Sequence, residues 1–380
     1  MNAALDYERF VPAYIRRFQA YIPSKPDDEL RRMYGFDRLY RLNNNENFLG
    51  PPPAALRVLR DHQDGRKIAI YPSGDSFYLR QALAERFGKD PDQFLVGNGS
   101  CEVIATVIKA FCEAGDNIVT ADRTFAVYEW VAEFSGFEAR LVPLRDNAFD
   151  DEAMLARVDG RTKIIFICNP NNPTGTGWNR DRLARFLDRA RHCVVVVDEA
   201  YCEFVDDPDF PDGMKLMETY PNLVIFRTFS KMFGLAGLRV GYLAAEPALM
   251  SFIRRPYVVY SVNTLAQAAA AEAVRHGEEH VRATRAMVRE GKAALLPALE
   301  RLGLPYVNGE GNFIMVKVPL SDTLFYRRMM PRGFMVRTMT SFRYPGWIRV
   351  TVAPAPVMAA FAAALEDASG AGKATCTSFR

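Results

Sequence analysis

The sequence predicts an α/β protein that has a large domain with a mostly parallel sheet and a smaller α+β domain. Its 380 residues are too many for one ordinary domain and fit two. The apolar runs TKIIFIC (162–168) and CVVVVD (193–198) have the composition of strands buried on both faces. The amphipathic segment NRDRLARFLDRAR (179–191) lies between them. A helix between two such strands indicates a crossover connection and parallel pairing.

The middle of the chain continues this alternation. Strands are predicted at 94–97, 116–121, 162–168, 193–198, 222–228 and 239–245, and helices at 100–113, 124–134 and 179–191. Ser100 is a candidate N-cap for the helix that begins there. Because parallel sheets bind ligands at the carboxyl ends of their strands, we expect the functional site at that edge.

The two ends of the chain are predicted to differ from the middle. Residues 1–40 are expected to form a polar arm, and residues 41–255 the large domain. The region from about 250 to 300 has the pattern of a long helix. Further strands are predicted at 312–318, 333–338 and 347–352, and a closing helix at 355–368. Residues 256–368 are therefore assigned to an interdomain helix and the smaller domain, and residues 369–380 to a disordered tail.

Composition excludes several classes of protein. The net charge of +3 is too small to indicate a nucleic-acid or membrane-surface partner. No apolar run is long enough for a transmembrane helix, and the N-terminus lacks the apolar core of a signal peptide. The six cysteines form no CxxC pair and no zinc-like spacing with histidine, so we expect no metal site. Reduced thiols in a cytoplasmic protein are the expectation.

Three segments that follow predicted strands carry chemically active side chains. They are CNPNNPTGTG (168–177), DEAYCEF (198–204) and TFSKMFGLAGLRVGY (228–242). Asp198 is either a helix N-cap or a buried carboxylate that needs a cationic partner. Lys231 is either a surface lysine or an amine made nucleophilic by apolar surroundings. Arg239 suits a phosphate or carboxylate, although a lone arginine is more often in a salt bridge.

Together, NPNNPTG, DEAY and SK with an arginine eight residues later resemble the ordered motifs of fold-type I, class I/II aminotransferases. The resemblance runs from about residue 20 to about residue 367 and implies a three-layer large domain that binds pyridoxal 5'-phosphate. It implies that Lys231 forms a Schiff base with the cofactor and moves the substrate proton. It further implies that Asp198 pairs with the pyridine nitrogen and that Tyr201 and Asn172 hydrogen-bond the phenolic oxygen.

The same resemblance assigns the cofactor phosphate and the ring face. Ser230 and Arg239 would bind the phosphate, with backbone amides of Ser100, Cys101 and Glu102 in GNGSCEVI (97–104). Without the resemblance, GNGS could be a plain turn. Phe125 would stack on the pyridine ring, where its alternative is an ordinary core residue.

The N-terminal third resembles the histidinol-phosphate aminotransferase subfamily. The segments that carry this resemblance are AYIPSKP (20–26), RLNNNENFLGPP (41–52) and IAIYPSG (68–74). It implies that Tyr71 reaches the cofactor phosphate of the partner in a homodimer. It also implies that Tyr21 and Asn47 lie on the substrate side, and that Arg337 and Arg349 hold the substrate's anionic groups. Arg349 would take the α-carboxylate of glutamate.

Some positions depart from that subfamily pattern. Cys101 replaces a common aspartate, Phe125 a tyrosine, Phe48 the proline of NENP, and Ala353 a glycine. These departures bear on the substrate and leave the cofactor residues intact. The leading expectation is transamination between glutamate and histidinol phosphate. The alternative is a diverged relative that acts on an aromatic or basic amino acid, by transamination or by elimination or cyclisation.

Two readings from other classes have little support in the sequence. An aminotransferase-like sensor of a transcription regulator would need a DNA-binding module, and only about 40 residues precede the family-like region. A nucleotide binder would need GxGxxG after a strand or GxxxxGK[ST], and neither motif occurs.

Overall fold

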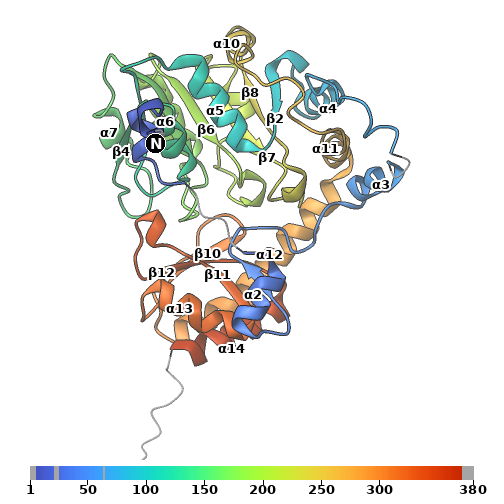
Figure 1. Ribbon diagram of the computed structural model, residues 1–380, viewed down its shortest axis with the longest axis vertical. Coiled ribbons are helices and arrows are strands. Elements are labelled where there is room, and N and C mark those ends of the chain that lie inside the picture. The colour runs from blue at the N-terminus through green and yellow to red at the C-terminus, as the bar shows by residue number, and fades with distance from the viewer. Residues whose placement is uncertain (1–5, 21–24, 63–64, 370–380) are drawn as a thin grey trace, which may run out of the picture.

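The computed structural model describes residues 6–20, 25–62 and 65–369. Tyr21 and residues 370–380 of the predicted tail lie outside the described residues. The chain forms a large lobe and a smaller lobe, joined by the long helix α12 (Glu278–Arg301) (Figure 1). No helix in the described ranges is long and apolar enough to cross a membrane.

The large lobe is built on a seven-stranded sheet with the order β2-β8-β7-β6-β5-β3-β4. Its strands are β2 (Phe94–Gly97), β3 (Asn117–Ala121), β4 (Glu138–Val142), β5 (Thr162–Cys168), β6 (Val194–Asp198), β7 (Leu223–Thr228) and β8 (Gly241–Ala245). The pairs from β4 to β7 are all parallel, whereas β8 is antiparallel to both of its neighbours. The mostly parallel sheet is therefore confirmed.

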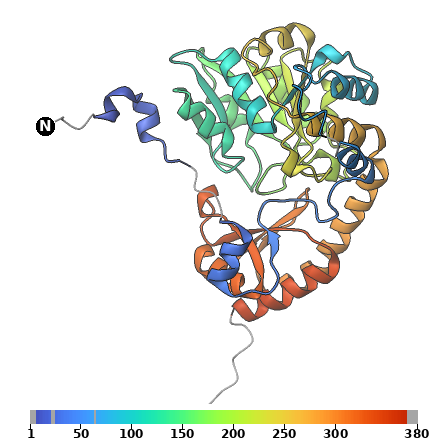
Figure 2. The ribbon, with the colours of Figure 1, turned by 45° about the vertical axis from the view of Figure 1, so that its right-hand side comes forward.

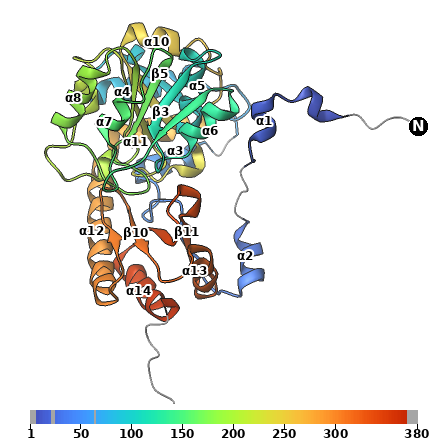
Figure 3. The ribbon, with the colours of Figure 1, turned by 90° about the vertical axis from the view of Figure 1, so that its left-hand side faces the viewer.

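Helices cover both faces of this sheet and give the predicted three layers. Figure 3 shows α5 and α6 on one side of the strands and α8 on the other. The helices of this lobe are α3 (Pro53–Asp61), α4 (Phe77–Phe87), α5 (Ser100–Phe111), α6 (Val127–Phe134), α7 (Asp151–Leu155), α8 (Arg180–Arg189), α9 (Gly213–Leu216), α10 (Pro247–Ile253) and α11 (Thr264–His276). Short 3-10 turns are η2 (Pro91–Gln93), η3 (Cys202–Phe204) and η4 (Ala236–Leu238). Fully buried residues such as Ile165, Val196 and Ile225 form the centre of the core.

The smaller lobe has a five-stranded sheet with the order β1-β11-β12-β10-β9. Its strands are β1 (Tyr40–Leu42), β9 (Tyr306–Val307), β10 (Phe313–Lys317), β11 (Phe334–Thr338) and β12 (Trp347–Thr351). Its helices and turns are α2 (Asp27–Tyr34), α13 (Asp322–Met329), η5 (Met330–Arg332), η6 (Thr340–Phe342) and α14 (Ala355–Ser369). α14 therefore extends one residue into the predicted tail.

The predicted domain boundary at residue 41 differs from the observed arrangement. β1 pairs in parallel with β11, and the side chains of Leu30 and Phe36 pack against Met330 and Met335. Much of the predicted arm therefore belongs to the smaller lobe. This pairing joins residues about 300 positions apart, so no local sequence pattern predicts it.

The single long helix predicted for 250–300 is also wrong. The region contains α10, α11 and α12, and Asn263 caps α11 by accepting from the Ala266 amide at 2.9 Å. Gly277 separates α11 from α12, and a side chain there would meet the Ala273 carbonyl. Because α11 packs on α3 and α4, it belongs to the large lobe, and α12 leads from it into the smaller lobe.

The N-terminal segment consists of η1 (Tyr7–Phe10) and α1 (Ala13–Arg17). Beyond α1, the Phe18 ring packs edge-on against Phe134 of α6, with 5.5 Å between the ring centroids. From this contact η1 projects away from the body of the molecule (Figure 2). Tyr7 and Phe10 are consequently exposed.

Candidate active site

Lys231 lies three residues after the end of β7, where the chain turns away from the sheet. Its Nζ donates a hydrogen bond to the Asn44 carbonyl at 2.6 Å. Burial lowers the pKa of the Lys231 amine to about 8, and the nearby positive charge of Arg349 acts in the same direction. A larger share of this amine is neutral near pH 7 than for an ordinary lysine, as a nucleophile requires.

Asp198 ends the neighbouring strand β6, and its side chain is 3% exposed. The Tyr128 hydroxyl donates to Oδ2 at 2.6 Å, and the Ala200 amide donates to Oδ1 at 3.1 Å. Burial raises the pKa of Asp198 to about 6, while these two hydrogen bonds lower it. No described residue forms a salt bridge with Asp198, so a buried carboxylate is held at the strand end without a protein cation.

Tyr201 follows Asp198 by three residues and is buried. Its hydroxyl accepts a hydrogen bond from Asn45 Nδ2 at 2.9 Å, which leaves its own proton for a further acceptor. Burial raises the pKa of Tyr201 to about 12, and Arg349 and Asn45 oppose that effect. The phenol therefore stays protonated at neutral pH and serves as a donor.

Asn172 lies in the loop after β5 and joins the two lobes. Its Oδ1 accepts a hydrogen bond from Nη1 of Arg349, which is on β12 of the smaller sheet. Nη2 of Arg349 donates to the Asn43 carbonyl at 2.8 Å. Because Oδ1 is occupied, the amide group of Asn172 is the part that remains for the predicted bond to the cofactor.

The N-terminus of α5 forms an uncapped group of backbone donors. Its N-cap is Gly99 and not the predicted Ser100, so no side chain caps the first turn. A side chain at Gly99 would collide with the Arg239 guanidinium, which places that cation beside the helix start. The amide of Ser100 is close to Gly241, at the beginning of β8. Free amides and a guanidinium together form an anion site.

The other residues predicted to bind the phosphate are Ser230, Cys101 and Glu102, and their side chains differ in burial and in hydrogen bonding. Ser230 is buried, with its amide bonded to Thr228 Oγ1 at 3.1 Å. Desolvation raises the pKa of the Cys101 thiol, and the charges of Arg239, Asp198 and Lys231 also act on this pKa, so Cys101 lies near all three groups. The Glu102 carboxylate is bonded to the Asn98 amide at 2.6 Å and to Ser261 at 2.7 Å. Glu102 therefore holds the loop in place with its side chain.

Arg337 and Arg349 are cross-strand partners in the pair β11–β12. Like charges directly opposite one another destabilise a sheet unless an anion lies between them. In the described part of the chain neither guanidinium has a carboxylate partner, and the buried Nε of Arg349 has no acceptor. Burial lowers the pKa of Arg349 to about 10, with Arg337 contributing. Two adjacent guanidinium groups without a carboxylate partner have the chemistry of an anion site.

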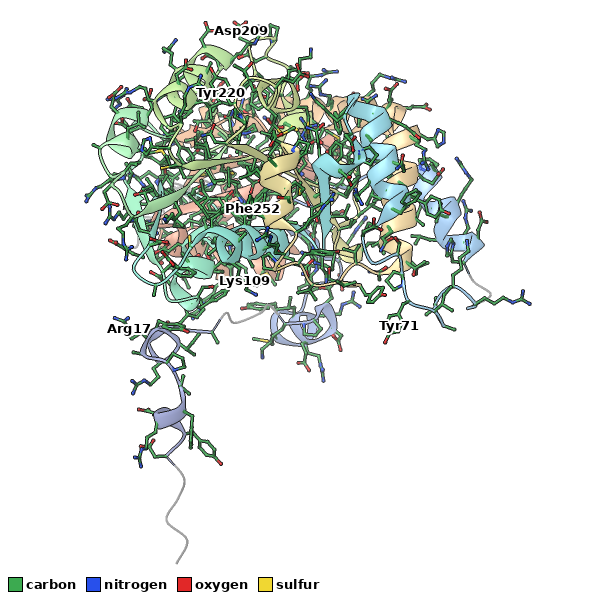
Figure 4. All side chains as sticks on the ribbon, turned by 90° about the horizontal axis from the view of Figure 1, so that it is seen from above. Arg17, Tyr71, Lys109, Asp209, Tyr220 and Phe252 are labelled. Atoms are coloured by element: carbon green, nitrogen blue, oxygen red, sulfur yellow. The ribbon has the colours of Figure 1, made fainter. Side chains whose placement is uncertain are left out.

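The remaining predicted residues have mixed outcomes. Phe125 is half-buried and meets Tyr128 edge-on, with 5.6 Å between the ring centroids. The side-chain amide of Asn47 is used within the chain, where it donates to the Met232 carbonyl at 2.7 Å and to Thr284 Oγ1 at 3.0 Å. Its Oδ1 accepts from the Leu49 amide. Tyr71 is 82% exposed and points outward at the periphery (Figure 4).

Sequence reasoning missed three residues that the structure brings to the site. Tyr128 holds Asp198, Asn45 holds Tyr201, and Phe342 lies over the arginine pair. For Asn45 the sequence offered a hint, because an asparagine-rich run such as NNNEN often contains a left-handed residue. Asn45 adopts this conformation (φ 57°), which asparagine tolerates better than most residues. Tyr128 and Phe342 had no such signal, because an aromatic residue in a helix or turn is ordinarily part of a core.

The residues at this edge fit pyridoxal phosphate. The α5 amides with Arg239 suit the phosphate, and the isolated carboxylate of Asp198 suits a protonated ring nitrogen. Tyr201 and Asn172 retain donors for the ring oxygen. Lys231 supplies an amine of lowered pKa. Each chemical group of the cofactor thus has a matching group in the chain.

Comparisons with known proteins agree with this site. The histidinol-phosphate aminotransferase of Symbiobacterium thermophilum is 40% identical over 359 residues, which cover 94% of this chain and 98% of that protein. That of Moorella thermoacetica is 39% identical over 89% of this chain and 87% of that protein. The solved structure of histidinol-phosphate aminotransferase from Sinorhizobium meliloti in complex with pyridoxal-5'-phosphate has a TM-score of 0.83 and 25% identity, over 95% of this chain and 98% of that one.

The family comparison covers both lobes. The model described as aminotransferase class I and II matches residues 38–365, from β1 of the smaller sheet through most of α14. Every residue assigned above to the cofactor edge lies within that span, and so do Arg337 and Arg349. The chain belongs to the class I and II aminotransferases and is a pyridoxal-phosphate-dependent enzyme.

Proposed function

We propose that this enzyme transfers an amino group between the pair glutamate/2-oxoglutarate and the pair histidinol phosphate/imidazole acetol phosphate. The observation that carries the proposal is that Arg337 and Arg349 lie opposite each other without a carboxylate partner among the described residues, with Arg349 near Lys231. Each of these substrates is anionic and could supply that partner. The names of the relatives from Symbiobacterium thermophilum and Moorella thermoacetica support the second pair of substrates.

The roles of the chain's own residues follow from their positions. Pyridoxal phosphate, when bound, supplies an electron sink for negative charge at the substrate α-carbon. Lys231 acts as the cofactor attachment point and then as the base that moves the α-proton, since its amine is neutral above a pKa of about 8. Asp198 provides a fixed negative charge beside the ring nitrogen. Tyr201 donates a hydrogen bond and does not itself titrate at neutral pH.

On the substrate side, Arg349 would take the α-carboxylate of glutamate. It is already oriented by Asn172 and by the Asn43 carbonyl, so little side-chain freedom is lost when an anion binds. Arg337, opposite it in the sheet, is available for a second anionic group. Two adjacent cations fit a dicarboxylate in one half-reaction and a phosphate monoester in the other.

We also propose that the enzyme works as a homodimer. Ile68, Ile70 and Tyr71 are each at least 65% exposed, and Val258 and Tyr260 are more than half exposed. The rings of Tyr71 and Tyr260 lie 5.0 Å apart, so these residues form one apolar patch. A patch of this kind on a folded chain marks a protein interface. In the dimer Tyr71 would reach the partner's cofactor phosphate.

A half-reaction screen tests the proposed substrates. Holoenzyme would be mixed singly with glutamate, histidinol phosphate, phenylalanine and arginine, and the visible absorbance of the bound cofactor followed, with product identified by mass spectrometry. We expect glutamate and histidinol phosphate each to convert the cofactor to its amino form. Conversion by phenylalanine or arginine, with none by histidinol phosphate, would replace the proposed substrate. Release of ammonia or a cyclic product without the amino form would indicate elimination or cyclisation.

A further inference from the structure

The turn between β11 and β12 is firmly held in the smaller lobe. The buried carboxylate of Asp322 accepts hydrogen bonds from the amides of Met339 and Thr340, both at 2.8 Å, and from Thr340 Oγ1 at 2.7 Å. Within the turn the Phe342 amide donates to the Met339 carbonyl at 2.9 Å. The segment Met339–Tyr344, here called the β11–β12 turn, is therefore an ordered element.

Arg343 of this turn reaches the large lobe. Its Nη1 donates to the Asp122 carbonyl at 2.6 Å and to Glu129 Oε2 at 3.0 Å, and its Nη2 donates to Glu129 Oε1 at 2.7 Å. A guanidinium that engages both oxygens of one carboxylate is the strongest geometry for such a pair. Arg343 also has φ 60°, a conformation that favours glycine, so its side-chain contacts offset a backbone cost.

The next residue makes a second contact across the same boundary. The Tyr344 hydroxyl donates to Asn147 Oδ1 at 2.9 Å, and the Arg123 guanidinium lies over the Tyr344 ring at 4.9 Å. Two consecutive residues of the smaller lobe are thus tied to the large lobe. The cavity that remains between Phe125, Glu129 and the turn is only about 10 Å³. At this place the two lobes are packed against each other.

These contacts determine where Phe342 lies. Its ring is 5.5 Å from the Arg337 guanidinium and 5.7 Å from that of Arg349. Phe342 also lines the same small cavity as Phe125, the residue predicted to stack on the cofactor ring. Phe342 therefore lies beside both arginines and close to Phe125.

Helix α6 links the β11–β12 turn to Asp198. Glu129, which binds Arg343, directly follows Tyr128, which donates to Asp198. Tyr128 is fully buried and stacks on Phe166 of β5 at 4.7 Å, so the helix is fixed to the sheet. The turn is consequently held against an element whose position is set by the core of the large lobe.

We propose that Phe342 is a specificity-determining residue and that Arg343 is the positioning residue that holds it, through Glu129. This inference rests on the transamination proposed above. Phe342 selects amino substrates that carry a flat ring beside an anionic group, because its half-buried ring lies next to both guanidinium groups and a substrate held by them would pack beside it. Glutamate has no ring and uses the arginines alone.

The experiment compares Phe342→Leu and Arg343→Gly in the holoenzyme, with Arg301→Ala as the matched control. Arg301 is an exposed arginine of the smaller lobe, paired with Glu366 at 3.0 Å and remote from the turn. Glycine at 343 accepts the positive φ, so that variant loses the contact without new strain. We expect both test variants to raise KM for histidinol phosphate about 5- to 10-fold and KM for glutamate less than about 2-fold.

Two further readouts separate positioning from general damage. Hydrogen exchange of the Phe342, Arg343 and Tyr344 amides should accelerate in Arg343→Gly, with or without cofactor, and not in Arg301→Ala. In a Glu129→Gln background, Arg343→Gly should add little to either KM, because the two residues act through one contact. Unchanged exchange in Arg343→Gly would overturn the positioning role. Equal KM changes for both substrates in Phe342→Leu would overturn the specificity role.

The roles of Phe342 and Arg343 can be tested even if histidinol phosphate is not the substrate. If the wild-type enzyme leaves histidinol phosphate unconverted, that failure belongs to the proposed function, and the exchange measurement still decides the role of Arg343. The KM comparison is then made between glutamate and the amino substrate that the enzyme does convert. A preference for ring-bearing substrates that survives Phe342→Leu would overturn the inference in that case too.

Discussion

On the cofactor side of the site, Asp198 ends one parallel strand of the large sheet and Lys231 follows its neighbour, and the contacts that hold Asp198 come from the large lobe. On the substrate side, Arg349 is on the smaller sheet and is oriented by Asn172 and Asn43, which lie outside that sheet. In the proposed function the catalytic groups therefore lie on the core of the large lobe, and the substrate-binding arginine Arg349 lies at the boundary between the lobes. A change at the boundary can alter substrate selection without moving the catalytic groups.

The difference also appears in the charges of the two sides. On the cofactor side Asp198 is a buried carboxylate without a salt-bridge partner among the described residues, whereas the substrate side presents two adjacent cations. Among the described residues neither Asp198 nor the pair of Arg337 and Arg349 has a salt-bridge partner. We therefore expect a bound molecule to supply the opposite charge at each place. The predictions below test whether the two sides act separately, beginning with the largest expected effect.

Lys231→Ala should lower turnover by about 10⁴-fold, because it removes both the attachment point and the proton carrier. The visible absorbance of the bound cofactor should change with it. Steady-state assays and an absorbance spectrum give the measurement, and Lys109→Ala, on the outer surface (Figure 4), is the control. Normal turnover in Lys231→Ala would remove the lysine from the mechanism.

Asp198→Asn should lower kcat about 10²- to 10³-fold while the cofactor still binds, because the ring nitrogen loses its counter-charge. Tyr128→Phe should lower kcat about 10-fold, since only one hydrogen bond to the carboxylate is lost. Cofactor affinity is measured by fluorescence titration of both variants. Equal losses in the two variants would show that Tyr128 does more than hold Asp198.

Arg349→Lys should raise KM for glutamate about 10- to 100-fold, because an ammonium cannot reproduce the forked contact with a carboxylate. The effect on kcat should be smaller, in contrast to Asp198→Asn. Arg332→Lys, whose partner Asp367 lies on the far side of the smaller lobe, serves as the control. A fall in kcat with unchanged KM would place Arg349 on the cofactor side.

The smallest effect expected is a shift in titration. In cofactor-free enzyme, labelling of Lys231 by an amine reagent should reach half its maximum near pH 8, because the reactive neutral amine accumulates above the lowered pKa. Arg349→Gln should move this midpoint upward, since Arg349 contributes to the lowering. Mass spectrometry of the labelled peptide over pH 6 to 11 gives the midpoint. An upward-shifted wild-type midpoint near 10.5 would contradict the assigned environment.

Much of the cofactor side could be predicted from the sequence. Buried apolar runs predict strands, and a polar residue directly after such a run must lie at the sheet edge, so Asp198 and Lys231 could be placed together. The sequence could not reveal the contacts of Asn47, because its partners Met232 and Thr284 are 185 and 237 residues away. Nor could it divide the lobes, since β1 pairs with a strand near the other end of the chain.

The sequence by itself determined most of the strands, although not β1, β4 or β9, and it singled out the lysine, the carboxylate and the two arginines, because each depends on a local pattern or motif. Only the tertiary structure decided which groups support them: Tyr128 behind Asp198, Asn45 on Tyr201, and Arg343 on Glu129. These contacts join segments that are distant along the chain, and their geometry is fixed by packing between helices, sheets and lobes. No periodicity within one segment carries that information.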